Sequence, residues 1–172
     1  MNIFKRTPAN VISMEDALPG REAPIQISGK HFVNGTSMKP PFHAQMETII
    51  FGMGCFWGAE RIFWEVPGVY TTAVGYSGGT TPNPTYGETC TSRTGHTEAV
   101  LVVFDPAEVT LEALFKEFWE NHDPTQHMGQ GNDHGTQYRT AIYGLNGVQL
   151  EAAKASLVTY QRSEEHTSEL QS

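Results

Sequence analysis

The fold is decided around the stretch Ile49-Ile50-Phe51-Gly52-Met53-Gly54-Cys55-Phe56-Trp57-Gly58-Ala59-Glu60. It opens with a short apolar run, residues 49–53, which is typical of a buried strand. Apolar side chains then repeat at helical spacing from Phe56 to Phe63, and Pro67-Gly68 ends that helix. The pattern therefore predicts a strand that turns directly into a helix at Cys55.

Three further strands and two further helices are expected downstream. The strand segments are rich in β-branched and aromatic residues and cover residues 69–76, 98–104 and 138–143. Thr110 is expected to cap a helix whose apolar face runs to Phe118. Asn146 is expected to cap a last helix with four apolar side chains turned inward: Leu150, Ala153, Leu157 and Val158. The order β-α-β-β-α-β-α predicts an α+β two-layer sandwich with ferredoxin-like β-α-β-β-α-β connectivity.

The chain divides into three expected segments. Residues 1–45 are polar and interrupted by Pro and Gly, which predicts an irregular N-terminal extension that wraps the domain or is partly mobile. Residues 46–161 form the expected α+β domain. Residues 162–172 break the amphipathic pattern and read as the translation of a short-read sequencing adapter. We therefore expect a non-native tail on a domain truncated at its C-terminus, with an ordinary frayed terminus as the alternative.

Composition excludes several classes of protein. A chain of 172 residues with 38% apolar composition suits one domain with one core. The net charge of −8, without a Lys/Arg stripe, argues against nucleic-acid binding. No stretch has the length of a membrane-spanning helix or the apolar core of a signal peptide. Two cysteines are too few for a disulfide scaffold, so we expect a cytoplasmic protein, monomeric by default, that binds no membrane.

Cys55 is a candidate nucleophile because of its place at a helix start. Backbone N–H groups and the helix dipole favour a negatively charged thiolate there. Phe56 and Trp57 follow directly and can supply an apolar wall. The alternative is a buried, inert cysteine, which is the more frequent fate of a lone Cys. Position alone leaves the two interpretations about even.

A set of ordered motifs decides between them. The motifs are Gly54-Cys55-Phe56-Trp57-Gly58-Ala59-Glu60, Pro67-Gly68-Val69, Gly75-Tyr76-Ser77-Gly78-Gly79, Pro82-Asn83-Pro84-Thr85-Tyr86, Thr94-Gly95-His96-Thr97-Glu98-Ala99-Val100, Phe118-Trp119-Glu120-Asn121-His122-Asp123-Pro124 and Gly131-Asn132-Asp133-His134-Gly135-Thr136-Gln137-Tyr138-Arg139-Thr140. Together they cover roughly residues 47–161 and resemble the A-type peptide methionine sulfoxide reductases (peptide-methionine (S)-S-oxide reductases). Any single Gly-rich block would be weak, whereas the ordered set is specific.

The resemblance implies a reaction and a set of site residues. The Cys55 thiolate attacks the sulfur of a methionine (S)-sulfoxide side chain, methionine leaves, and Cys55 becomes a sulfenic acid. Glu98 is implied as the acid that protonates the sulfoxide oxygen, and burial would have to raise its pKa for that task. The remaining implied residues are Tyr86 and Tyr138 as hydrogen-bond donors to that oxygen, Phe56 and Trp57 around the methyl group, and Asp133 in support of the site.

Each of these residues has an ordinary structural alternative. Glu98 could be a surface glutamate at a strand edge. Tyr86 and Tyr138 could be half-buried aromatics whose hydroxyls bind the backbone. Asp133 could simply form a turn.

The expected reaction leaves open how the Cys55 thiol is regenerated from the sulfenic acid. The family resolves the sulfenic acid with cysteines near its C-terminus, which thioredoxin then reduces, and we find none of them here. We therefore expect thioredoxin or dithiothreitol to act as an external reductant, with no bound cofactor. Cys90 could stand in as the resolving thiol, although a packed free thiol is favoured. The cluster of His122, Asp123, His127, Asp133 and His134 lacks firm ligand spacing, so no metal is expected.

Three functions compete at this point. The first is the protein-repair reductase that the resemblance implies, with oxidised peptides and proteins as substrates. The second is a Cys–His hydrolase or acyl transferase in which His96 acts as the base for Cys55. The third is a module that binds oxidised methionine without turning it over.

Overall fold

A central strand organises the molecule. The computed structural model describes residues 10–171, with side chains as far as residue 165. In it, β1 (Glu47–Met53) pairs antiparallel with β3 (Thr97–Phe104) on one side and with β6 (Thr140–Tyr143) on the other. β2 (Val69–Ser77) pairs with the free edge of β3, so that the sheet order is β2-β3-β1-β6. This is the order that ferredoxin-like connectivity requires, and the predicted α+β fold is confirmed.

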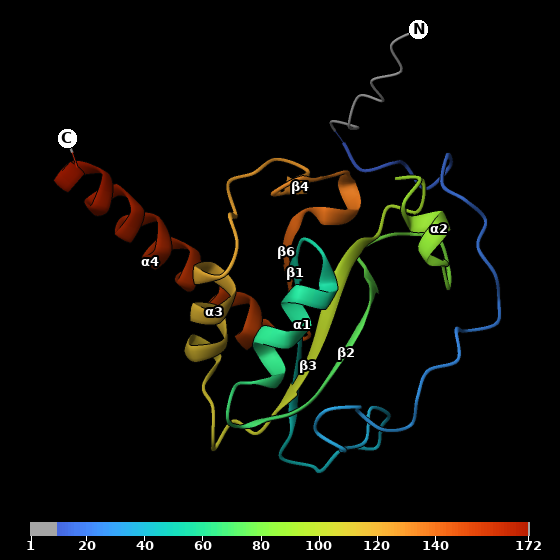
Figure 1. Ribbon diagram of the computed structural model, residues 1–172, viewed down its shortest axis with the longest axis horizontal. Helices are drawn as coiled ribbons and strands as arrows, with labels where there is room; N and C mark the ends of the chain where they lie inside the picture. The colour runs from blue at the N-terminus through green and yellow to red at the C-terminus, as the bar shows by residue number, and fades with distance from the viewer. Residues whose placement is uncertain (1–9, 172) are drawn as a thin grey trace, which may run out of the picture.

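Two helices cover one face of this sheet (Figure 1). They are α1 (Phe56–Trp64), which joins β1 to β2, and α3 (Leu111–Glu120), which joins β3 to the second half of the domain. Thr110 caps α3 as expected, because its side-chain oxygen accepts a hydrogen bond from the N–H of Ala113 at 3.2 Å.

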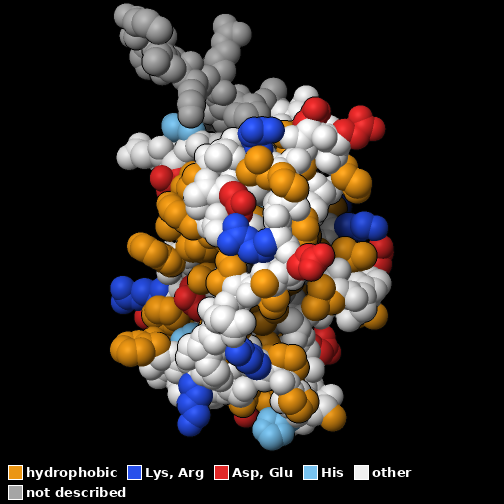
Figure 2. All heavy atoms as spheres, turned by 90° about the vertical axis from the view of Figure 1, so that its right-hand side faces the viewer, with side chains coloured by type: hydrophobic (Ala, Val, Ile, Leu, Met, Phe, Trp, Pro, Cys, Tyr) orange, Lys and Arg blue, Asp and Glu red, His pale blue; other side chains and the backbone are white. Residues whose placement is uncertain are grey.

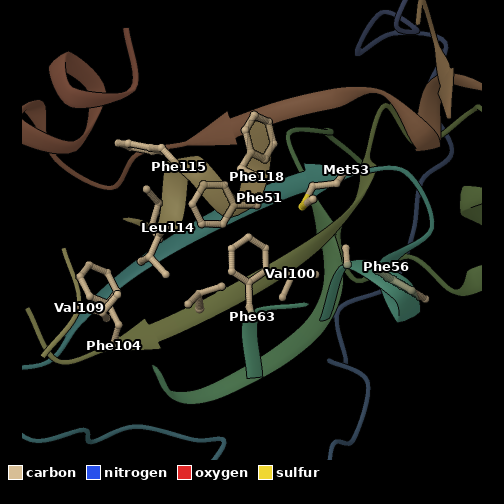
Figure 3. Close-up of a cluster of buried hydrophobic side chains, with 13 residues drawn as sticks. Phe51, Met53, Phe56, Phe63, Val100, Phe104, Val109, Leu114, Phe115 and Phe118 are labelled. Carbon is tan, nitrogen blue, oxygen red and sulfur yellow. The ribbon is translucent and has the colours of Figure 1, made fainter. Parts of the chain in front are cut away.

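The core lies between the sheet and these two helices (Figure 3). Alternate residues of β1 and β3 point toward the helices, and their side chains are buried: Ile49, Phe51, Met53, Val100, Val102 and Phe104. The Phe51 ring stacks on Phe63 with centroids 4.7 Å apart and lies 5.4 Å from Phe118. Phe56 lies at the edge of the same cluster, away from the other rings (Figure 3).

Removing one ring from this stack should be costly. Phe63 is fully buried and holds α1 against the sheet, so Phe63→Ala leaves a cavity that rigid neighbours cannot close. We expect the free energy of unfolding to fall by about 3–5 kcal/mol. Urea titration followed by far-UV circular dichroism measures it. Lys116→Ala, on α3, is the control and should change the same quantity by less than about 0.5 kcal/mol. Equal losses in both variants would contradict the assignment of Phe63 to the core.

Several short elements were not foreseen in the sequence. α2 (Tyr86–Thr89) follows β2, although its capping box was readable: Thr85 and Glu88 exchange side-chain and backbone hydrogen bonds. The Gly-rich loop contains a two-stranded ladder, β4 (Gly129–Gln130) with β5 (Asp133–His134). A 3-10 turn, η1 (Thr136–Tyr138), takes up the first residue of the expected strand 138–143, so that β6 begins only at Thr140.

The last helix, α4 (Gly147–Gln171), follows the prediction only at its start. The Asn146 side chain accepts a hydrogen bond from the N–H of Gln149 at 2.9 Å, which confirms the expected cap. Of the four side chains expected inward, Ala153 packs on the core, whereas Leu150, Leu157 and Val158 are exposed. The inward positions are held instead by Ala152 and by the fully buried Gln149, whose amide donates to the carbonyl of Thr48 at 3.0 Å.

The backbone of α4 runs without interruption through residue 162, where the expected non-native tail begins. The helix continues to Gln171, and its C-terminal half projects past α3, away from the sheet (Figure 1). Before this point Tyr160 stacks on Trp119 at 5.1 Å, and the Trp119 indole N–H donates to Ser156. The side chains of residues 166–172 lie outside the described part. The adapter origin of the tail stays a prediction that sequencing of the source locus can test.

The N-terminal extension follows the side of the molecule that carries β2 and α2 (Figure 1). His31 is buried, and its Nδ1 accepts hydrogen bonds from the N–H groups of Val33 and Asn34. Its Nε2 therefore donates to Thr72 Oγ1 at 2.8 Å, and Thr72 donates in turn to Glu60 of α1 at 2.9 Å. This chain of hydrogen bonds links the extension to β2 and α1.

Candidate active site

Cys55 lies at the junction that the sequence predicted. It is the N-cap residue of α1 and is exposed, whereas the preceding residues of β1 are buried. The chain turns at Gly54, whose φ of 86° favours glycine. A Cβ at Gly54 would also lie only 2.5 Å from the Cβ of Gln130. The close approach of the β4 segment and the tight turn therefore both require glycine, and together they present Cys55 at the surface.

Glu98 lies beneath the start of α1. On β3 it continues the row of Val100, Val102 and Phe104 that fills the core, and it is only 2% exposed. One carboxyl oxygen accepts a hydrogen bond from the N–H of Phe56 at 3.0 Å, so the carboxyl is fixed one residue from Cys55. The predicted burial of Glu98 is thus confirmed, and the surface alternative is wrong.

The surroundings of Glu98 favour its protonated form. Burial raises the pKa of this carboxyl above the ordinary glutamate value, and the negative charge of Asp133 raises it further. The hydrogen bond from Phe56 acts in the opposite direction because it favours the carboxylate. Burial outweighs it. Glu98 is therefore suited to hold a proton at a pH where an exposed glutamate would have lost it.

Both expected tyrosines, Tyr86 and Tyr138, lie close enough to Glu98 for its charge to affect their pKa values. Tyr138 is half-buried at the end of η1, and burial, followed by the charge of Glu98, raises its pKa to about 12. Tyr86 is 58% exposed at the start of α2. A hydrogen bond with Cys90 raises the pKa of Tyr86 first, and smaller contributions come from Glu98 and Cys55. Both phenols thus keep their protons at neutral pH and remain hydrogen-bond donors.

A third tyrosine near Glu98, Tyr76, was not among the site residues that the sequence predicted. Tyr76 pairs directly with Glu98 in the β2–β3 ladder, and its ring lies 5.8 Å from that of Phe56. Burial, and then the charge of Glu98, raises the pKa of Tyr76 to about 12. Residue 76 reads in the sequence as the end of a strand; only the register between β2 and β3 shows that it faces the acid.

The two aromatic residues after Cys55 have opposite exposures. Phe56 is 8% exposed and belongs to the core, whereas Trp57 is 74% exposed on the first turn of α1. Asp133 is exposed on β5, where its charge acts on Glu98.

The expectation of a packed Cys90 is wrong: the thiol is exposed directly after α2, beside the Tyr86 hydroxyl.

The hydrolase alternative loses its base. His96 Nδ1 accepts a hydrogen bond from the N–H of Gly79 at 3.2 Å, so its Nε2 donates to the carbonyl of Thr81 at 2.8 Å. Both ring nitrogens are therefore occupied by backbone groups, and neither is left to accept a proton from Cys55. Within residues 10–171, no group of three or more His, Cys, Asp or Glu side chains is placed to bind a metal ion. His122 is half-buried and bonded to the carbonyl of Phe118 at 2.6 Å and to the hydroxyl of Thr140 at 3.1 Å.

An exposed thiol at a helix start, with a buried carboxyl of raised pKa beneath it, is the arrangement of a thiol-dependent enzyme. Comparison with known proteins gives the family. The family model described as "Peptide methionine sulfoxide reductase" matches residues 47–171. The chain belongs to the peptide methionine sulfoxide reductase family.

Relatives and solved structures agree with this assignment. The peptide methionine sulfoxide reductase MsrA of Rhodospirillum centenum is 60% identical over 93% of this chain and 73% of its own length. MsrA 1 of Caulobacter vibrioides is 62% identical over 88% of the chain and 70% of its length. The solved methionine sulfoxide reductase A of Corynebacterium diphtheriae superposes with a TM-score of 0.84 at 46% identity, covering 92% and 76% of the two chains. Reduced Mxr1 from Saccharomyces cerevisiae gives a TM-score of 0.67 at 28% identity, covering 71% and 72%.

No helix within residues 10–171 is both long enough and apolar enough to cross a bilayer.

Proposed function

We propose that this chain reduces methionine (S)-sulfoxide in peptides and proteins, with Cys55 as nucleophile and Glu98 as proton donor. The observation that carries the proposal is the buried Glu98 carboxyl, bound to the N–H that directly follows the exposed Cys55. Family membership and the names of the relatives, at 54–62% identity, support the same activity. The class of activity is protein repair by a peptide-methionine (S)-S-oxide reductase.

The reaction moves one oxygen atom and two electrons. The Cys55 thiolate attacks the sulfoxide sulfur, and Glu98 protonates the sulfoxide oxygen, which would otherwise be a very poor leaving group. The oxygen ends on Cys55 as a sulfenic acid, methionine is released, and the cysteine sulfur has been oxidised by two electrons.

The other residues are proposed to hold the substrate. Tyr86 and Tyr138 donate hydrogen bonds to the sulfoxide oxygen, and their raised pKa values keep them protonated for this role. Trp57, which is exposed beside Cys55, and Phe56 contact the methyl group of the substrate. Asp133 supports the site through its charge, which raises the pKa of Glu98.

Recycling of Cys55 requires an external thiol in this proposal. Dithiothreitol can reduce the sulfenic acid directly, and thioredoxin is the proposed physiological reductant. One solved structure of Mxr1 is a complex with Trx2, which supports a thioredoxin partner. No resident metal or cofactor takes part. Two free thiols fit a reducing compartment, so we place the activity in the cytoplasm. The catalytic unit is proposed as residues 46–161.

A stoichiometric assay tests the proposal. Purified protein is mixed with a methionine sulfoxide peptide without added thiol, and methionine is counted by mass spectrometry. We expect about one equivalent from the S epimer with loss of one thiol, and repeated turnover once dithiothreitol is added. The R epimer serves as the control and should give almost no product. Binding of the S epimer without any product would support a mere binding module and contradict the proposal.

A further inference from the structure

The loop that carries Tyr86 is held from outside the α+β domain. Five residues of the N-terminal extension, 18–22, form a segment that we call the clasp; it lies against the loop between β2 and β3. The N–H of Leu18 donates to the carbonyl of Arg93 at 2.8 Å, and the N–H of Arg21 donates to the carbonyl of Pro82 at 3.1 Å. The clasp thus contacts the loop on both sides of Tyr86.

Side chains of the loop complete the attachment. The Thr81 hydroxyl donates to the carbonyl of Leu18 at 2.8 Å, and the Asn83 amide donates to the carbonyls of Arg21 and Glu22 at 2.9 and 3.1 Å. At Gly20 (φ 65°) the backbones are so close that a Cβ would collide with the carbonyl of Pro82. These hydrogen bonds are directional and repeat along the clasp. They fix the loop more firmly than non-directional packing over the same number of residues would.

Arg21 reaches the cap of the helix that begins with Tyr86. One Glu88 carboxyl oxygen accepts hydrogen bonds from the N–H and the hydroxyl of Thr85, at 2.7 and 2.9 Å. The same oxygen accepts a hydrogen bond from the Arg21 guanidinium at 2.9 Å. Arg21 therefore fixes the rotamer of the residue that closes the capping box, and Tyr86 is the next residue after the Thr85 cap.

Burial contributes little to holding Tyr86, and the hydrogen bond of its hydroxyl goes to Cys90, at the end of the same short helix. Its side chain is 58% exposed, and α2 spans only Tyr86–Thr89, too short to be stable by itself. Figure 2 shows the side of the molecule that the extension and α2 occupy, where apolar side chains lie scattered among charges of both signs and form no continuous hydrophobic patch. Polar bonds therefore help to fix the position of the loop, together with the burial of Pro84 and Thr89 on either side of Tyr86.

We infer that the clasp, through Arg21 and Glu88, positions the Tyr86 hydroxyl for the reaction, so that the N-terminal extension supports the catalytic unit from outside residues 46–161. Arg21 is a positioning residue and touches no substrate. The inference rests on the proposed function, since it assigns Tyr86 a hydrogen bond to the sulfoxide oxygen. A misplaced hydroxyl donates a weaker hydrogen bond in the transition state, and that loss slows the chemical step more than it weakens substrate binding.

A double-mutant cycle tests the inference in the full chain. Arg21→Ala should lower the single-turnover rate of methionine formation by roughly threefold to tenfold with little change in KM, and Arg21→Lys should restore most of it. In a Tyr86→Phe background, Arg21→Ala should change the rate by less than about twofold, because the hydroxyl it positions is already gone. Amide hydrogen exchange should speed up at Thr89 and Cys90, which bond back to the start of α2.

Arg61→Ala is the matched control. It also removes an Arg–Glu ion pair, with Glu65 at 3.1 Å, but on the exposed far end of α1. Its single-turnover rate should equal that of the unmodified chain. Equal rates for Arg21→Ala and the unmodified chain would overturn the inference and leave the proposed function intact. The same Arg21→Ala loss in the Tyr86→Phe background would also overturn it, since the clasp would then act on stability alone. Absence of methionine from the unmodified chain would instead refute the proposed function.

Discussion

Cys55→Ser should abolish sulfoxide reduction, with a loss of roughly 10⁴-fold or more in single-turnover rate, because a serine hydroxyl is not a nucleophile at neutral pH without a base. His96, the candidate base of the hydrolase alternative, has both ring nitrogens bonded to backbone groups. The fold should be unaffected, since residue 55 is exposed and makes no side-chain cap bond. Methionine formation from the S-sulfoxide peptide measures the loss.

Cys90→Ser is the control for this substitution. Cys90 is the second thiol of the chain and lies beside Tyr86, so it shares the neighbourhood but not the proposed role. We expect it to retain one equivalent of methionine formation without added thiol. A sulfenic-acid-trapping diketone should label the unmodified chain and Cys90→Ser on Cys55 after one turnover. Label on Cys90 with Cys55 left reduced would refute the assignment of the nucleophile.

Glu98→Gln should slow reduction by about 10²–10⁴-fold, the usual contribution of a positioned proton donor. The amide keeps the size of the carboxyl and can still accept the hydrogen bond from Phe56, so the start of α1 should keep its geometry. Single-turnover rates measured across the pH range check the result. Glu117→Gln, on the neighbouring α3, is the matched control and should keep the rate of the unmodified chain.

The pH dependence follows from the raised pKa of Glu98. Because the folded-state pKa lies above that of an unfolded glutamate, the carboxyl stabilises the fold fully below the unfolded pKa, and this stability is lost as the pH rises through the folded pKa. The rate should fall over the same rise, because the acid loses its proton. Glu98→Gln should lack this falling limb and should match or exceed the unmodified chain in Tm at pH 7. A clearly lower Tm of Glu98→Gln at pH 7 would contradict the conclusion that burial dominates the protonation state of Glu98.

Local patterns in the sequence were sufficient for the strand–helix junction and for the order of the elements. The position of Cys55 follows from one element, a helix start, and the burial of Glu98 from the first part of an apolar strand, whereas the role of Glu98 as the acid came from the family resemblance. Tyr76 could not, because its proximity to Glu98 depends on the register of two strands about 20 residues apart in sequence. Family motifs supplied Tyr86 and Tyr138, which no periodicity marks.

The misjudged parts of the fold have physical causes. Leu150, Leu157 and Val158 have helical spacing but remain exposed, because α4 packs on the domain with another of its faces. That face carries Gln149, Ala152, Ala153, Ser156 and Tyr160. Gln149 is buried in their place because it satisfies both ends of its amide on neighbouring backbone groups, which hydropathy does not register. Tertiary contacts, rather than local preference, decided these positions.

The exposed stretch between the clasp and His31 has a consequence for proteolysis. Residues 23–30 are all exposed, and Lys30 offers a trypsin cleavage point within them. A single cut there would leave the clasp held by non-covalent contacts alone, among them its hydrogen bonds and the Arg21–Glu88 pair. The clasp would then belong to a bound peptide and no longer to the same chain. Such a peptide dissociates on dilution, because the cut removes the high effective concentration that the covalent link provided. Nicked protein should therefore keep its thiol and its core while its activity becomes dependent on concentration.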